Sequence, residues 1–86
     1  MGSTPSGGAR RRVTLYTAAG CGLCAEALDV LREAQPVLGF ALEVVDIDGD
    51  DELERRYRVL LPVVEVDGEQ AFVYHVDEAA LHALLT

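Results

Sequence analysis

The run Cys21-Gly22-Leu23-Cys24 holds the only two cysteines of the chain, and the pattern around it limits the folds that the chain can adopt. Residues 13–17 before it are apolar and β-branched, as in a buried strand. The glycines that flank the first cysteine provide the backbone freedom for a tight turn. Apolar side chains then recur at helical spacing. The sequence therefore predicts a strand, a sharp corner that carries both cysteines, and a helix over residues 23–35.

The segments that follow continue this alternation of strand and helix. Pro36 is expected to end the first helix, because proline disfavours helical geometry in the residue before it. Residues 42–47 are apolar on both faces, which is typical of an inner strand. Residues 50–58 begin with acidic side chains and place Leu53 and Tyr57 one turn apart, which predicts a short helix.

The last third of the chain has the pattern of a hairpin followed by a helix. Asp67-Gly68 separates two alternating runs, 62–66 and 69–74, and this dipeptide is a strong hairpin signal. Asp77 can cap a final helix whose leucines face the core, namely Leu81, Leu84 and Leu85. The order β-α-β-α-β-β-α predicts an α/β fold in which helices flank a four-stranded mixed sheet.

Composition sets the organisation and the surroundings of this domain. Residues 1–12 are rich in Gly, Ser and Pro and are expected to form a flexible tail, and residues 13–86 a single domain. The net charge of −8 disfavours nucleic acids and anionic membranes as partners. The sequence shows no signal peptide and no apolar run near the ~20 residues that span a bilayer. We therefore expect a cytoplasmic monomer.

In the cytoplasm, a Cys-x-x-Cys motif is more often catalytic or metal-binding than structural. A structural zinc site needs four ligands, and the only histidines, His75 and His82, lack the spacing of a zinc finger. We therefore assign no metal ligands. Three alternatives to redox chemistry stay open: an iron–sulfur cluster shared between two chains, an inert thiol pair, and a module that binds a protein partner without turnover.

The acidic run over residues 46–51 invites a calcium interpretation, but it lacks the glycine and glutamate that an EF-hand loop needs at its sixth and twelfth positions. We interpret Asp48 and Asp50 as caps of the short helix that follows. Arg58 is the cation that we expect nearest to the cysteines, where it could help to bind an anionic substrate.

The order of elements, with Cys-x-x-Cys at the first strand–helix corner and Pro62 opening the third strand, resembles the thioredoxin fold. The short chain is similar to the small bacterial glutaredoxin-like proteins, and the resemblance covers residues 13–86. It implies that Cys21 is the exposed nucleophile and Cys24 the buried resolving cysteine. It also implies that Pro62 is held in cis, facing the dithiol. A thiol at a helix N-terminus ionises more readily, so we expect a lowered pKa for Cys21.

The same resemblance implies which residues contact a substrate. Leu61 offers its backbone to a peptide or to glutathione, and Tyr16 occupies an aromatic position before the cysteine loop. Gly22 and Leu23 replace the Pro-Tyr pair that is usual in glutaredoxins. Of the Gly-Gly-Asp motif that binds glutathione in that family, only Asp77 is present.

The function implied is that of a small thiol-disulfide oxidoreductase with no tightly bound cofactor. Its expected partners are disulfide-containing proteins or small thiol compounds, which it reduces through a mixed-disulfide intermediate. The expected electron donor is glutathione or a reductase. An arsenate-reductase-like activity on the same scaffold is a further alternative, and it requires positive charge close to Cys21.

Overall fold

The computed structural model describes residues 11–86, so residues 1–10 of the flexible tail expected over residues 1–12 lie outside the described part. Its elements are β2 (Arg12–Thr17), α1 (Gly22–Leu38), β3 (Ala41–Asp46), α2 (Asp51–Tyr57), the 3-10 turn η1 (Arg58–Leu60), β4 (Val63–Val66), β5 (Glu69–Val73) and α3 (Glu78–Leu85). Apart from η1, this is the predicted order. The expected tail boundary moves, because Arg12 already begins β2.

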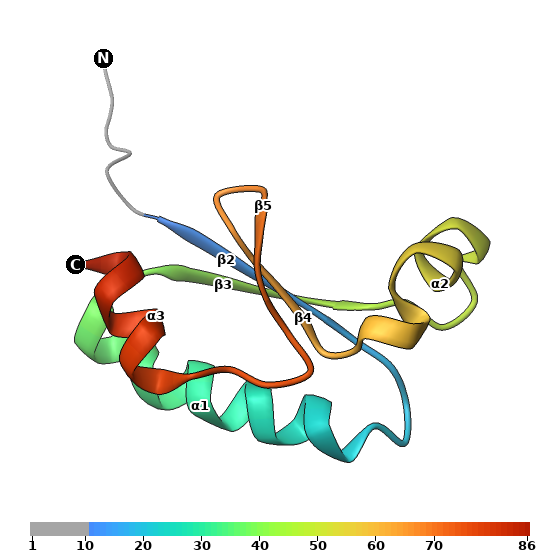
Figure 1. Cartoon of the computed structure of the whole chain (residues 1–86), viewed down its shortest axis with the longest axis horizontal. Coiled ribbons are helices and arrows are strands. Elements are labelled where there is room, and N and C mark those ends of the chain that lie inside the picture. Colours follow the sequence, from blue (N-terminus) through green and yellow to red (C-terminus); the bar gives the residue numbers. More distant parts are fainter. Residues whose placement is uncertain (1–10) are drawn as a thin grey trace.

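The four strands form one mixed sheet in the order β3-β2-β4-β5 (Figure 1). Strand β2 pairs parallel with β3 and antiparallel with β4, and β4 pairs antiparallel with β5. The prediction of an inner strand over residues 42–47 is therefore wrong, because β3 is an edge strand. Not all apolar residues of β3 are buried, and Val44 is 44% exposed.

Two clusters of buried side chains pack on the sheet. The main core joins α1 and α3 to the sheet through, among others, Leu31, Leu81, Leu15 and Val64. The smaller cluster packs Tyr57 of α2 against Ala18, Ile47 and Val63. Because side chains alternate between the faces of a strand, neighbours such as Val63 and Val64 serve different clusters. In Figure 1, α1 accordingly runs along the sheet with α3 beside one end of it, while α2 lies near the opposite end.

Helix α1 does not end at Pro36, contrary to the prediction. It continues to Leu38, so Pro36 lies in its last turn and its missing N–H costs the helix a single hydrogen bond. Partly buried Leu38 packs against the main core, which favours the extra turn. Gly39 then ends the helix in the left-handed conformation (φ 74°), and its N–H donates to the carbonyl of Gln35 at 2.7 Å.

The hairpin and the final helix form as predicted, with one difference. Asp67 and Gly68 both have positive φ (52° and 86°), as a two-residue hairpin turn requires. Asp77 Oδ1 accepts the N–H of Ala79 at 3.0 Å and that of Ala80 at 3.3 Å. The prediction that Leu84 faces the core is wrong, because its side chain is 43% exposed.

Asp67 also binds the first residue of β2. Its backbone N–H donates to the carbonyl of Arg12 at 2.8 Å, and its Oδ1 accepts the N–H of Arg12 at 2.9 Å. The guanidinium of Arg11 forms an ion pair with the same carboxylate. The N–H of Arg12 and this guanidinium lower the pKa of Asp67. No helix within residues 11–86 combines the length and the apolar character needed to cross a membrane.

Candidate functional site

The corner between β2 and α1 carries the two cysteines, which are joined by a disulfide. Cys21 is the N-cap of α1, and its sulfur accepts the backbone N–H of Cys24 at 3.1 Å. The Cα atoms of the pair are 5.2 Å apart, within the usual range for a disulfide. Cys24 is 2% exposed, whereas Cys21 is only half-buried. One sulfur is therefore accessible and the other lies one helical turn further in.

A shallow depression of about 490 Å³ lies over the disulfide. Its walls come from the end of β2 and the first turns of α1, and they consist of Thr17, Ala18, Gly20, Cys21, Gly22, Cys24, Ala25 and Leu28. A smaller hollow of about 50 Å³ joins Leu23 to the loop between β5 and α3, where Tyr74 and His75 contribute. The side chains of Leu23 and Tyr74 are each about half exposed, so the dithiol has an apolar rim.

The peptide bond between Leu61 and Pro62 is cis, as the resemblance implies. Leu61 packs against the small cluster that contains Ala18, so this segment and the end of β2 share a core. The N–H of Tyr74 donates to the carbonyls of Leu60 at 3.3 Å and Pro62 at 2.9 Å. Among the turn and loop hydrogen bonds of residues 11–86, none uses the carbonyl of Leu61.

Tyr16 lies in a polar cluster beside α2 and does not line the depression over the disulfide. Its ring stacks on that of Tyr57, with centroids 4.3 Å apart. The two hydroxyls donate to Glu65, Tyr16 to Oε1 at 3.4 Å and Tyr57 to Oε2 at 3.0 Å. Burial and the neighbouring carboxylate raise the pKa of Tyr57 to about 12, and they also raise that of Tyr16. This cluster was not predicted from the sequence, which instead assigned Tyr16 to substrate contact.

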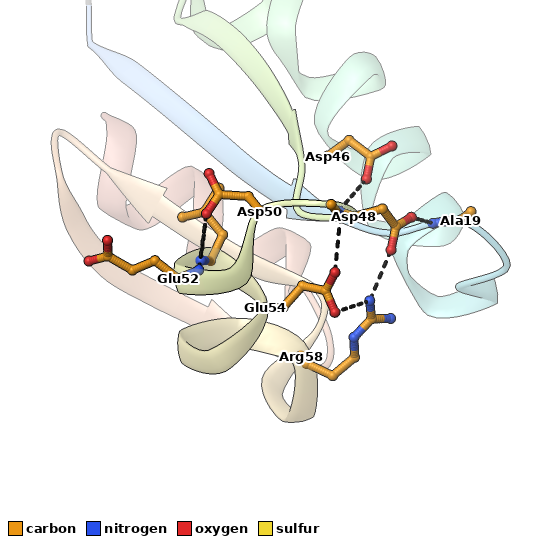
Figure 2. Close-up of polar contacts among 9 residues, drawn as sticks. Ala19, Asp46, Asp48, Asp50, Glu52, Glu54 and Arg58 are labelled. Atoms are coloured by element: carbon orange, nitrogen blue, oxygen red, sulfur yellow. Dashed lines mark hydrogen bonds and ion pairs between the residues drawn. The ribbon is translucent and has the colours of Figure 1, made fainter.

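A second polar network connects the cysteine loop to the loop between β3 and α2 (Figure 2). Asp48 Oδ2 accepts the N–H of Ala19 at 2.8 Å, and Asp48 Oδ1 accepts from Arg58 at 2.9 Å. Arg58 also donates to Glu54 at 2.9 Å, and Glu54 accepts the N–H of Gly49 at 3.0 Å. The backbone N–H groups, followed by Arg58, lower the pKa values of Asp48 and Glu54.

This network corrects the interpretation of Asp48 as a helix cap. Asp50 alone caps α2, accepting the N–H groups of Glu52 and Leu53 at 3.1 Å each. No single residue signals this contact, which follows only from the parallel pairing of β2 with β3. The carboxyl ends of β2 and β3 must meet at one edge of the sheet if the strands are parallel, so polar residues just after them can meet there. Arg58, the cation expected nearest to the cysteines, has two acidic partners, Asp48 and Glu54.

No group of three or more His, Cys, Asp and Glu side chains arranged to hold a metal ion occurs within residues 11–86. The residues that the sequence assigned to the site separate into two sets. Cys21, Cys24 and Gly22 line the depression, and Leu23 lines the adjoining hollow. Leu61 packs, like Tyr16, against the small cluster, and Pro62 beside it is fully buried and lines neither hollow.

Comparison with known proteins finds a matching family and similar folds. Residues 12–86 match the family model of the Glutaredoxin-like domain (DUF836). Among curated proteins, the uncharacterized protein Rv0508 of Mycobacterium tuberculosis is 35% identical over 79 residues, which cover 86% of this chain and 81% of the relative.

Solved structures have the same arrangement of elements. The solution structure of protein Ne2328 from Nitrosomonas europaea aligns with a TM-score of 0.77 at 33% identity, covering 90% of this chain and 93% of that chain. A mutant thioredoxin from Halobacterium salinarum aligns with a TM-score of 0.65 at 26% identity, covering 87% of this chain and 71% of that chain. The predicted thioredoxin-type α/β fold is therefore confirmed.

Proposed function

The chain belongs to the family of glutaredoxin-like domains, and on that premise we propose that it is a thiol-disulfide oxidoreductase. The observation that carries the proposal is the asymmetry of the Cys21–Cys24 pair at the N-terminus of α1. Cys21 is partly accessible and receives an N–H at its sulfur, while Cys24 is almost fully buried. A nucleophile must meet its substrate, and a resolving thiol needs only to reach the nucleophile.

The reaction divides into two thiol exchanges. In the reduced protein, the Cys21 thiolate attacks one sulfur of a substrate disulfide, and the other substrate sulfur leaves as a thiolate and takes up a proton. Cys24 then gives up its proton and attacks the Cys21 sulfur of the mixed disulfide, which releases the second substrate thiol. The substrate gains two electrons, and the dithiol loses two and becomes the intramolecular disulfide of the structure.

The substrate lies, in this proposal, along the apolar rim beside the disulfide. Leu61 contributes its carbonyl, for which the turns and loops of residues 11–86 provide no hydrogen-bond donor. Gly22 leaves open space at the depression, since nothing lies within 4 Å of where a Cβ would be. Exposed Leu23 provides an apolar contact. The role of Tyr16 is then to support the loop from below, because its hydroxyl is engaged with Glu65.

An external thiol returns the dithiol to its reduced form, and we propose glutathione or a protein reductase as this donor. The residues near α3 bear on the choice between them. The Asp77 carboxylate accepts two N–H groups of α3, and the side chain of Val76 packs into the main core. Asp77 Oδ1 and the side chain of Val76 are thus engaged within the fold, which favours the protein reductase as the donor.

An equilibrium titration in glutathione redox buffers tests the proposal. After acid quenching and alkylation, the mass of the protein counts its free thiols. We expect a single two-electron transition between the dithiol and the Cys21–Cys24 disulfide. Absence of an intramolecular disulfide at every ratio of reduced to oxidised glutathione would contradict the proposal and favour a module that binds metal or a protein without turnover.

Trapping distinguishes the two cysteines. Cys24→Ser should accumulate a mixed disulfide with a model disulfide substrate, because the resolving thiol is absent. Cys21→Ser is the matched control and should accumulate far less, since the remaining thiol is buried. Equal trapping by the two variants would exclude the assigned roles.

A further inference from the structure

The hydrogen bond between Ala19 and Asp48 links two loops that are far apart in the sequence but adjacent at one edge of the sheet (Figure 2). Ala19 lies two residues before Cys21, in the turn that follows β2. Asp48 lies two residues after the end of β3. Strands β2 and β3 are parallel and in register as far as Thr17 and Asp46, so both loops leave the sheet side by side.

The Asp48 carboxylate is itself held in place. One of its oxygens accepts from Ala19 and the other from Arg58, so each oxygen has a partner. Arg58 is positioned by Glu54 from the previous turn of the chain, and Glu54 accepts the N–H of Gly49. The pKa of Asp48 is lowered, so its carboxylate stays ionised at neutral pH and the hydrogen bond from Ala19 is charge-assisted.

We propose that Asp48, held by Arg58, is a positioning residue of the redox site that fixes the turn before Cys21 and so favours the Cys21–Cys24 disulfide. The inference deepens the proposed oxidoreductase function and rests on it. Asp48 touches neither sulfur in this scheme. It acts through the backbone of Ala19 and Gly20.

The physical reason is conformational freedom in the reduced protein. Gly20, between Ala19 and Cys21, has a φ of 76°, and nothing lies within 4 Å of where its Cβ would be. A glycine in open space has many conformations available once its neighbour is released. In the oxidised protein the disulfide already restrains this turn. Loss of the Asp48 contact therefore adds more freedom to the dithiol than to the disulfide, because fixing a residue's backbone costs conformational entropy.

The test is the same glutathione titration, performed on three variants and a control. Asp48→Ala removes both contacts and should lower the equilibrium constant for disulfide formation about tenfold, equivalent to about 30 mV. Asp48→Asn keeps an oxygen acceptor for Ala19 and should shift this equilibrium constant less than threefold. The control Asp50→Asn makes the same change of charge at the cap of α2, away from Ala19, and should leave the equilibrium constant unchanged.

Arg58→Gln separates positioning from simple charge. If Asp48 acted through its charge on the Cys21 thiolate, removal of the neighbouring cation would favour the disulfide. If it acts by position, the loosened carboxylate holds Ala19 less well, so the equilibrium should shift about threefold toward the dithiol. Because Arg58 is at the surface, Arg58→Gln is expected to fold, and it still tests the positioning role if Asp48→Ala does not fold.

Each outcome decides between named alternatives. If the wild-type protein titrates as expected and the equilibrium constants of Asp48→Ala and Arg58→Gln lie within 1.5-fold of the wild-type value, the positioning role is overturned and the proposed function stands. Equal shifts in Asp48→Asn and Asp48→Ala would assign the effect to charge and overturn it as well. Failure of the wild-type protein to form the disulfide would overturn both this role and the proposed function. Unfolding of each reduced variant in urea confirms that it is folded before titration.

Discussion

The backbone N–H of Cys24 donates to the sulfur of Cys21 at 3.1 Å, so the first turn of the helix offers one of its free donors to the outer member of the pair. A donor at this position stabilises negative charge on the sulfur once the disulfide is reduced.

We expect the pKa of the Cys21 thiol in the reduced protein to lie below the ~8.5 of a free cysteine. The measurement is the rate of iodoacetamide alkylation between pH 4 and pH 10 in Cys24→Ser, which has one thiol. Cys21→Ser serves as the comparison and should react more slowly throughout, because Cys24 is buried. A midpoint at 8.5 or above in Cys24→Ser would show that the helix terminus does not activate this thiol.

Alkaline pH should destabilise the fold through Tyr57. Its pKa is raised from 10.0 to about 12 in the folded protein, so its contribution to stability is complete below pH 10. Between pH 10 and pH 12 only the unfolded chain ionises at this residue, which costs up to about 1.4 kcal/mol per pH unit. Urea unfolding over this range should show the loss. Tyr57→Phe should show a flatter dependence on pH, and an unchanged slope would contradict the assignment.

Acid should weaken the attachment of β2 to the hairpin. The pKa of Asp67 is lowered from 3.8, chiefly by the N–H of Arg12 and then by Arg11. Its contribution is therefore present above pH 3.8 and is lost as the pH falls through the folded-state value. Asp67→Asn removes the charge while tolerating the positive φ of the turn. The variant should be less stable at pH 6 and closer to the wild-type protein at pH 3; a constant difference in urea midpoint would rule out this origin.

Two Gly→Ala substitutions should change stability in opposite directions. Gly39 has a φ of 74°, where an alanine is strained, so Gly39→Ala should destabilise the protein by about 1 kcal/mol. Gly22 lies in the first turn of α1 with open space around its Cα, and Gly22→Ala should stabilise by up to about 1 kcal/mol. Thermal unfolding of the oxidised proteins measures both. Shifts of the same sign would show that backbone conformation does not control the ends of this helix.

The sequence predicted most of the elements because their signals are local. The Asp67-Gly68 turn, the Asp77 cap and the apolar spacing of α1 each depend on a few neighbouring residues. The same locality explains the errors. Pro36 carries a stop signal that packing of Leu38 against the core overrides, and two-sided apolar character in β3 did not distinguish an edge strand from an inner one.

The cysteines of the candidate site could be predicted from their spacing, whereas the groups that support them could not. Asp48 carries the sequence signal of a helix cap, and only the parallel pairing of β2 with β3 brings it to Ala19. Glu65 carries no signal of its own, and its two tyrosine partners come from β2 and α2. Contacts of this kind depend on the register between distant segments, which single residues do not encode.

The attachment of Arg12 to the hairpin turn sets the distance between the start of the domain and its disulfide. Strand β2 enters the sheet beside Asp67 and leaves it at the cysteine loop six residues later, which corresponds to about 20 Å. A fluorescent reporter or an electrode linker joined ahead of Arg11 therefore starts at the end of the sheet opposite the dithiol. The protein can be immobilised or coupled to a sensor there while its redox centre faces the solution.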